Sequence, residues 1–360
     1  MNKEFIIIDP RPLEAFKDKT FSDFKKRDVL NKLFKCIDEG KIEESCYWIT
    51  ECICSGYSIE LVEKLILHSS KINHINSPLL PEYLWRRYIT FLSSYDHIGK
   101  KEKDQLIHLR NTQNVRNILF DLVTTITLSP RSKRFDKYPK VKDDDFQYTN
   151  IQNKLKATMQ ILPSHIIRFT DPEELRIIMN EFLFHLKNRN GGYTDAIYWV
   201  AWLIHWEKIN KKKKVTFEIE CRDISEVNPK HCKDPIWLIW EIIFYECSER
   251  SENIKIQIQS LYRLFRQDYS CGKRNTRLSL IYHCIGYLTY PINFNIPVRK
   301  DKNIFIQTQC NVNLMFKAKK GNEVKTYTPP LVKVRKVTGS AKEIALSKFN
   351  TLLDIDELSR

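Results

Sequence analysis

Glycine is scarce in this chain: 9 of its 360 residues are glycine. Because glycine supplies many of the tight turns that join short strands, this scarcity argues against a many-stranded β fold and favours helices. Long apolar runs are also missing, and none approaches the roughly 18–20 apolar residues of a membrane span. The opening MNKEFIIIDPRP has only a short apolar run and does not resemble a signal peptide. We therefore expect a soluble protein of the cytoplasm or nucleus, neither secreted nor held in a membrane.

The common motifs of catalysis and metal binding are absent too. The sequence contains no GxxxxGK[ST] phosphate loop, no GxSxG turn and no CxxC pair. Its cysteines are scattered singly, and Cys221, His231 and Cys232 lack the spacing of a four-ligand zinc site. We expect reduced thiols, no metal, no cofactor and no enzymatic activity. An enzyme with a dispersed active site is an alternative, because such a site leaves no local motif.

What the chain does have is dense helical patterning. The stretch Asp195 to Trp206, DAIYWVAWLIHW, is apolar around nearly its whole circumference and predicts a helix buried on most sides. We interpret it as the central helix of the core. The predicted fold is mainly α, a multi-helix orthogonal bundle or helical array with one core from about Phe21 to Pro297. A small terminal β element is expected where Phe5 to Ile8 pairs with the alternating segment Asn303 to Gln309.

Changes in pattern along the chain predict its organisation. The predicted segments begin with an extended lead or strand (1–20), a first helical subdomain (21–130), a charged loop (131–150) and a Trp-rich helical subdomain (151–297). A short strand region (298–316), a flexible basic arm (317–340) and a C-terminal docking helix (341–360) follow.

Positive charge is the strongest functional signal. Lys and Arg outnumber Asp and Glu by 59 to 44, which favours a polyanionic partner such as nucleic acid. Basic clusters recur along the chain, as in Lys25 to Arg27 and in SCGKRNTR, Ser270 to Arg277, which we interpret as a connector between helices. Several of the clusters lie in or near predicted loops beside aromatic residues. Such residues neutralise phosphates in a sequence-tolerant way, and aromatic side chains can stack on bases. The candidate nucleic-acid-binding residues are Lys133, Arg134, Lys211, Lys212, Arg263, Arg266, Lys273, Arg274 and Arg277.

The last segment, Ala341 to Leu358, combines apolar residues at mixed spacing with charge, and we interpret it as a helix that docks a protein partner. Its candidate contact residues are Ile344, Phe349, Leu352 and Leu353.

The segment Asp28 to Phe91 resembles the C-terminal helical collar of replication-associated AAA+ ATPases of the clamp-loader type. The matching stretches are LFKCIDEG at 33–40, EESCYWI at 43–49, Ser55-Gly56, and ELVEKLILHSS at 60–70. The resemblance covers less than a fifth of the chain and does not include the ATPase motifs. It implies an oligomerisation or replication-scaffold module without nucleotide hydrolysis. In style and segment order the whole chain is also similar to uncharacterised helical proteins of large nucleocytoplasmic DNA viruses.

The sequence therefore predicts a non-enzymatic, nucleic-acid-associated helical scaffold in genome replication, transcription or packaging, of viral type. Its basic loops would hold the phosphate backbone, and no sequence-specific reading is expected, because helix-turn-helix and zinc-finger signatures are missing. Two alternatives stay open at this point. One is a structural or virion-assembly protein that uses its charge and tail for protein contacts, and the other is the enzyme with a dispersed site.

Overall fold

The computed structural model describes residues 3–329, except for 97, 99–101, 133–138 and 216–217. The chain divides into a compact unit, Met1–Glu323, and a second unit, Val324–Arg360. The predicted docking segment, with Ile344, Phe349, Leu352 and Leu353, lies outside the described residues, as do residues 330–340 of the predicted basic arm.

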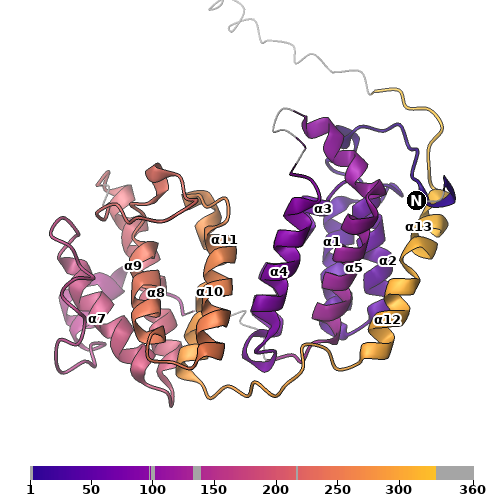
Figure 1. Cartoon of the computed structure of the whole chain (residues 1–360). Coiled ribbons are helices and arrows are strands. Elements are labelled where there is room, and N and C mark those ends of the chain that lie inside the picture. The colour runs from indigo at the N-terminus through magenta and orange to yellow at the C-terminus, as the bar shows by residue number, and fades with distance from the viewer. Residues whose placement is uncertain (1–2, 97, 99–101, 133–138, 216–217, 330–360) are drawn as a thin grey trace, which may run out of the picture. The chain divides into compact units, whose positions relative to one another are not determined.

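The described part of the first unit is mainly helical, as predicted, and contains no β-strand (Figure 1). The α-helices are α1 (Lys26–Glu39), α2 (Ile42–Cys54), α3 (Ser58–Ile72), α4 (Leu80–Ser93), α5 (Gln113–Leu128), α6 (Tyr148–Gln152), α7 (Glu174–Lys187), α8 (Gly192–Lys212), α9 (Ile236–Cys247), α10 (Glu252–Arg266), α11 (Cys271–Thr289), α12 (Lys302–Cys310) and α13 (Val312–Lys320). Short 3-10 helices are η1 (Lys3–Phe5), η2 (Leu13–Phe16), η3 (His74–Asn76), η4 (Lys103–Asn111), η5 (Asp143–Phe146) and η6 (Pro229–His231).

Helix α5 is the centre of the first group of helices. It packs against α1, α2, α3 and α4, and its side chains from Ile118 to Leu128 are all buried. Two glycines set the turns around it. Gly40 ends α1 and Gly56 follows α2, each in the left-handed conformation, with φ of 76° and 77°. The positive φ favours glycine at Gly56, and a side chain there would also force the ends of the Ile107 and Leu13 side chains to shift.

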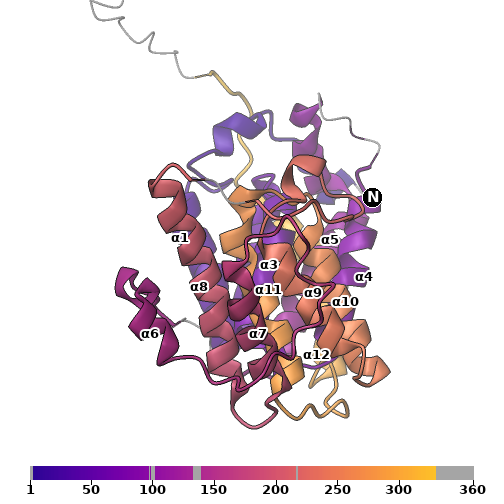
Figure 2. The ribbon, with the colours of Figure 1, turned by 90° about the vertical axis from the view of Figure 1, so that its left-hand side faces the viewer.

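Helix α11 is the centre of the second group. It packs against α7, α8, α9 and α10 (Figure 2). It also contacts α3 of the first group. The predicted Trp-rich helix is α8, and it is buried on most sides, with Trp199, Trp202 and Trp206 each less than a tenth exposed. The buried apolar residues of both groups form a single cluster from Ile7 to Phe316. The core is therefore continuous, but α5 and α11 occupy its centres rather than α8 alone.

The expected terminal strands are wrong. Asn303 to Gln309 lies in α12, which begins after Asp301, whose carboxylate accepts hydrogen bonds from the backbone N–H groups of Asn303 and Ile304. Helices α12 and α13 return to the first group and pack on α5 and α2 (yellow in Figure 1). Phe5 ends η1, and η1 contacts α13. The two ends of the unit do meet, but through helices.

Ile7 shows how the N-terminal segment is held without a sheet. The side-chain amide of Asn111 accepts a hydrogen bond from Ile7 N–H at 2.9 Å and donates one to Ile7 C=O at 2.8 Å. One side chain thus satisfies the two backbone groups that a neighbouring strand would otherwise pair.

Among the described helices, none has both the length and the apolar content that crossing a membrane requires.

Candidate nucleic-acid interface

The predicted phosphate-binding residues divide into buried and exposed groups. Arg274 is buried, and its Nη1 lies 2.6 Å from both Glu207 Oε2 and Asp234 Oδ1. Arg277 is also buried: Nη2 lies 2.6 Å from Glu63 Oε1, and Nη1 donates to two backbone carbonyl oxygens. These guanidinium groups hold α11 to its neighbours, so their assignment to phosphate contact is corrected. The stretch that contains them is the start of α11 and not a connector.

Of the remaining predicted residues, those that the structure describes belong to α8, α10 and α11. Arg266 donates to the carbonyl oxygen of Ser225 at 3.0 Å and lies 3.2 Å from Glu226, while the exposed Arg263 lies over the ring of Trp85. Lys273 is half-buried on α11. Lys211 and Lys212 are exposed at the end of α8, and Lys133 and Arg134 lie outside the described residues.

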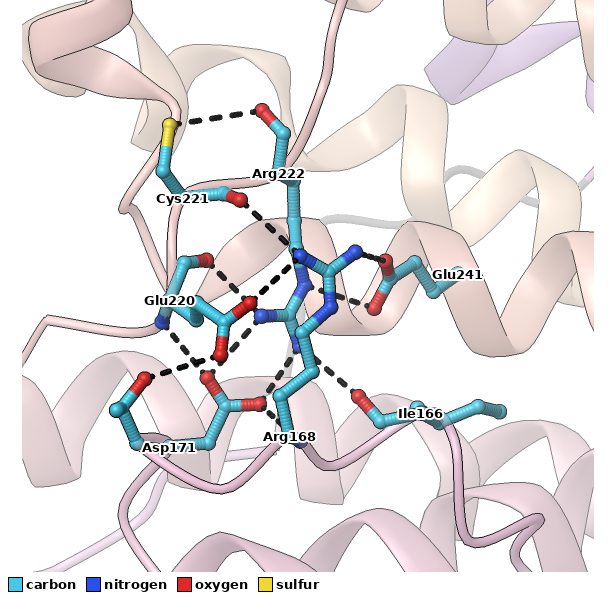
Figure 3. A network of polar contacts seen from close by, with 8 residues as sticks. Ile166, Arg168, Asp171, Glu220, Cys221, Arg222 and Glu241 are labelled. Atoms are coloured by element: carbon cyan, nitrogen blue, oxygen red, sulfur yellow. Dashed lines mark hydrogen bonds and ion pairs between the residues drawn. The ribbon is translucent and has the colours of Figure 1, made fainter.

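Arg222 shows most clearly how this chain uses positive charge internally (Figure 3). Its side chain is 2% exposed and lies 2.7 Å from Asp171 Oδ2 and 3.0 Å from Glu241 Oε2. Burial raises the pKa of Asp171, but the hydrogen bonds from Arg222 and from two backbone N–H groups outweigh it and leave the pKa below its ordinary value. The network ties the connector between α8 and α9 to the loop before α7 and to α9 itself. At its centre Arg222 and Asp171 are both enclosed, with side chains 2% and 0% exposed, so this pair acts in the fold.

A different set of basic residues lines two adjoining hollows, which together we call the basic groove. The first hollow has a volume of about 710 Å³ and the second about 330 Å³. Phe34 and Lys64 belong to both. The other residues of the first hollow are Lys17, Asp18, Lys19, Lys25, Lys26, Arg27, Leu30, Asn31 and Glu60. The other residues of the second are Leu67, His68, Lys71, Asn275, Thr276 and Ser279.

A tight turn before α1 presents the lysines of the first hollow. Lys19 and Lys25 form an isolated antiparallel bridge, and Thr20 N–H donates to Phe24 C=O at 2.8 Å. Phe21 anchors the turn, because its side chain is buried and its N–H donates to Ser55 Oγ. The turn leads directly into α1, so Lys17, Lys19 and Lys25 to Arg27 converge from a single short stretch of sequence.

The charge of the groove is only partly compensated. Glu60 accepts from Lys26 Nζ at 2.6 Å and lies 2.8 Å from Lys64 Nζ. Burial raises the pKa of Glu60, but these two ammonium groups outweigh it and hold the pKa below its ordinary value. Within the described part of the chain, no carboxylate pairs with four of the basic side chains that line the groove. They are Lys17, Lys25, Arg27 and Lys71.

An aromatic side chain lies where the two hollows meet. Phe34 is half-buried, and its ring packs against His68 with centroids 4.6 Å apart. His68 Nε2 lies 2.6 Å from Asp38 Oδ1, which fixes the imidazole. The groove thus combines cations on both sides with an aromatic surface between them, and it can accept an extended anion that carries planar rings.

Sequence reasoning noted Lys25 to Arg27 as a cluster but did not select it, and it missed Lys17, Lys19, Lys64 and Lys71. The dense run of basic residues from 17 to 27 was the available signal. That Lys64 and Lys71 continue the same surface follows only from the packing of α3 beside α1.

No group of three or more His, Cys, Asp and Glu side chains that could hold a metal ion is found among the described residues. No protein-family model, curated protein or solved structure matches this chain. The collar resemblance and the viral similarity therefore stay predictions.

Proposed function

We propose that this chain binds the phosphate backbone of nucleic acid through the basic groove, without reading sequence, as a non-enzymatic helical protein of genome replication, transcription or packaging. One observation carries the proposal: Lys17, Lys25, Arg27 and Lys71 line a concave surface and have no acidic partner in the described structure. Cations left unpaired by the fold are available to neutralise phosphates and to release their counterions.

The shape of the groove supports a strand rather than a single small anion. Arg27 and Phe34 lie two turns apart on α1, a distance of about 10 Å along the helix axis. This length exceeds that of a single small anion, so this part of the groove can accommodate more than one phosphate of a strand. Lys25, Lys26 and Arg27, at the N-terminus of α1, line the first hollow, and the positive dipole end of the helix adds to their charge.

Phe34 supports an unpaired strand over a duplex. Base stacking on an aromatic ring requires a base that is not already stacked within a helix. The ring lies at the middle of the groove, where a base could turn inward while its phosphates stay on the flanking lysines. We therefore expect single-stranded DNA or RNA to bind more tightly than duplexes of the same sequence.

Fluorescence anisotropy with single- and double-stranded DNA and RNA oligomers, at salt concentrations between about 20 and 200 mM, tests the proposal. The variant Lys25→Glu/Arg27→Glu/Lys71→Glu should weaken binding at least about tenfold. It should also reduce the slope of log Kobs against log salt by about 2 to 3, since each lost contact removes roughly 0.7 to 0.9.

A control of equal charge change separates the groove from net charge. Lys230, Lys300 and Lys302 are exposed, lie outside the groove and form no ion pair in the described structure. Their triple reversal to Glu should leave the salt slope within about 0.5 of the unmodified protein, because no phosphate contact is lost. Equal loss in both triple variants, or no binding even at the lowest salt, would overturn the proposal. The assembly alternative, with protein contacts in place of nucleic acid, would then take its place.

A further inference from the structure

A second concave site lies in the other group of helices, and its lining is mostly apolar, unlike that of the basic groove. It is a cavity of about 460 Å³ lined by residues of η5, α6, α7 and α8. Its walls are mostly apolar, with Phe146, Ile151, Ile177, Trp202 and Trp206 among the lining residues. Volume and lining are those of a small-molecule site. We call it the aromatic pocket.

The aromatic rings of this pocket are arranged as a series of faces. Trp202 and Trp206 are one turn apart on α8, and their rings are inclined by only 17° with centroids 6.4 Å apart. Phe146, from η5, packs on Trp202 with centroids 4.6 Å apart and rings inclined by 30°. Phe146, Trp202 and Trp206 all line the cavity, and stacking is the interaction by which aromatic rings favour a planar ligand.

Polar groups in the lining lack partners inside the protein. The side chain of Trp202 is 3% exposed, and its Nε1–H has no hydrogen-bond partner in the described structure. The Nδ2 amide group of Asn210 is likewise buried and unpartnered. Buried donors normally have partners, and a ligand in the cavity that accepts hydrogen bonds would supply them. A purely apolar ligand such as a fatty acyl chain would leave both unsatisfied.

The rim of the pocket adds groups of both signs. The exposed carboxylate of Glu174 provides an acceptor for a ring amino group, and Lys213 provides an exposed cation. Lys213 belongs to the exposed run Lys211 to Lys214 at the end of α8. These charges offset the negative dipole end of α8 and favour an anionic substituent on the ligand.

A nucleotide combines the features that match this lining. It has a planar ring, hydrogen-bond acceptors for Trp202 and Asn210, an amino group for Glu174 and a negative charge for Lys213. We propose that the aromatic pocket binds a nucleotide, with the base against Trp202 and Trp206 and the phosphate at Lys213. The base can come from a free mononucleotide or from an unstacked residue of a single strand. The inference does not rest on the basic groove, since the two sites share no residue.

Isothermal titration of the full chain with AMP, GMP, CMP and UMP tests the inference directly. Ribose 5-phosphate and the parent nucleosides serve as probes that lack the base and the phosphate respectively. We expect at least one mononucleotide to bind with a Kd below roughly 1 mM, and ribose 5-phosphate to bind at least tenfold more weakly. A short single-stranded tetranucleotide forms the second arm and identifies a strand as the source of the base.

Two variants place the binding in the pocket. Ile177 lines it and is 54% exposed, so Ile177→Trp fills the cavity from its open side without disturbing the core. Lys213→Glu reverses the charge at the rim. Both should weaken nucleotide or tetranucleotide binding at least tenfold. Ile306→Trp on α12, where Ile306 is 58% exposed, is the matched control and should change nothing.

The outcome is independent of the proposed function, because the Lys25→Glu/Arg27→Glu/Lys71→Glu variant should bind mononucleotides as well as the unmodified chain does. Binding of a mononucleotide, or of the tetranucleotide alone, that is lost in Ile177→Trp supports the inference. Failure of all nucleotides and the tetranucleotide to bind at about 10 mM, or binding that Ile177→Trp leaves unchanged, would overturn it. Capture of palmitate that no nucleotide displaces would overturn it as well.

Discussion

Lys319 on α13 and Glu51 on α2 form an ion pair inside the protein, with Nζ 2.6 Å from Oε2 and side chains 4% and 0% exposed. Glu51 also accepts hydrogen bonds from the N–H and hydroxyl groups of Ser22, and the Lys319 ammonium lies 3.7 Å from the ring centroid of Tyr47. Burial raises the pKa of Glu51, but Lys319 and Ser22 outweigh it and hold the pKa below its ordinary value. A lysine that the sequence placed in a flexible arm therefore fastens the last helix of the unit to its core.

Replacing Lys319 with Met should reduce the free energy of unfolding by about 3 to 5 kcal/mol, because the buried Glu51 carboxylate loses its counterion. Urea denaturation followed by circular dichroism measures the change. The matched control is Lys317→Met. Lys317 lies 2.9 Å from Glu4, but both side chains are about half exposed, so the loss there should stay below about 1 kcal/mol.

The double variant Lys319→Met/Glu51→Met should recover much of the lost stability, because no unpaired buried charge is left. If Lys319→Met and Lys317→Met cost the same, Lys319 is not buried in solution and α13 does not dock as described.

The second prediction concerns Arg274, which the sequence suggested as a nucleic-acid contact but which stabilises the fold by pairing with Asp234. Arg274→Met leaves Asp234, whose side chain is 1% exposed, without its cation and should cost about 3 kcal/mol or more. The neighbouring Lys273→Met should cost less than about 0.5 kcal/mol, since Lys273 is half-buried and forms no ion pair in the described structure.

Nucleic-acid affinity separates the two roles of Arg274. In the anisotropy assay, at a temperature where Arg274→Met is still folded, its affinity should match that of the unmodified chain within about twofold. A stable Arg274→Met protein with strongly weakened binding would instead return Arg274 to the interface.

The mainly helical fold could be predicted from the spacing of apolar residues. The alternation of apolar and polar residues from Asn303 to Gln309, however, led to the wrong prediction of a strand. Not one side chain of α12 is buried, and Ile304 and Ile306 are 38% and 58% exposed. An apolar pattern predicts structure only where it faces a core, so here the period of two carried no packing constraint. Asp301, two residues before Asn303, was the helix-capping signal that would have corrected the assignment.

The binding surface was harder to predict for a different reason. Along the sequence a buried arginine and an exposed one look alike, and only tertiary packing brings Glu63 to Arg277 or Asp171 to Arg222. The groove likewise joins a turn, α1, α3 and the start of α11, which are distributed between Lys17 and Ser279. Charge density along the sequence located part of it, but the residues left without a carboxylate partner could be identified only in the fold.

Gly192 begins α8 at a close approach to α7. A Cβ atom added there would lie 1.9 Å from the backbone oxygen of His185, so the start of α8 would have to shift. Gly192→Ala should therefore destabilise the protein by more than about 2 kcal/mol. Gly272→Ala is the control: its Cβ meets nothing nearer than Ser270 Oγ at 3.9 Å, and it should be neutral or stabilising by up to about 1 kcal/mol. Thermal unfolding of both variants checks the difference, and equal midpoints would contradict the close packing of α7 on α8.

His283 is a buried histidine at the centre of α11. Its ring stacks on Tyr287 with centroids 5.0 Å apart and planes inclined by 10°, and the ring of His74 approaches it edge-on at 6.3 Å. Burial, and then the charge that His74 can carry, hold the pKa of His283 well below the ordinary value of about 6.5. In the folded state the neutral imidazole is therefore strongly favoured.

The sign of the pH effect follows from this shift. Above about pH 6.5 the imidazole is neutral in both the folded and unfolded states, so it adds no pH dependence; below that value the unfolded chain takes up a proton that the folded state refuses. As the pH is lowered below about 6.5, the free energy of unfolding should therefore decrease, by up to about 1.4 kcal/mol per pH unit from this group. Urea denaturation between pH 5 and 8 should show that His283→Phe loses less stability than the unmodified chain on going from pH 7 to pH 5. His165→Gln, at an exposed histidine, should follow the unmodified chain. If the free energies of unfolding of the unmodified chain and of His283→Phe changed in parallel with pH, His283 would take up a proton equally in the folded and unfolded states. That outcome would contradict the burial of its ring against Tyr287 and His74.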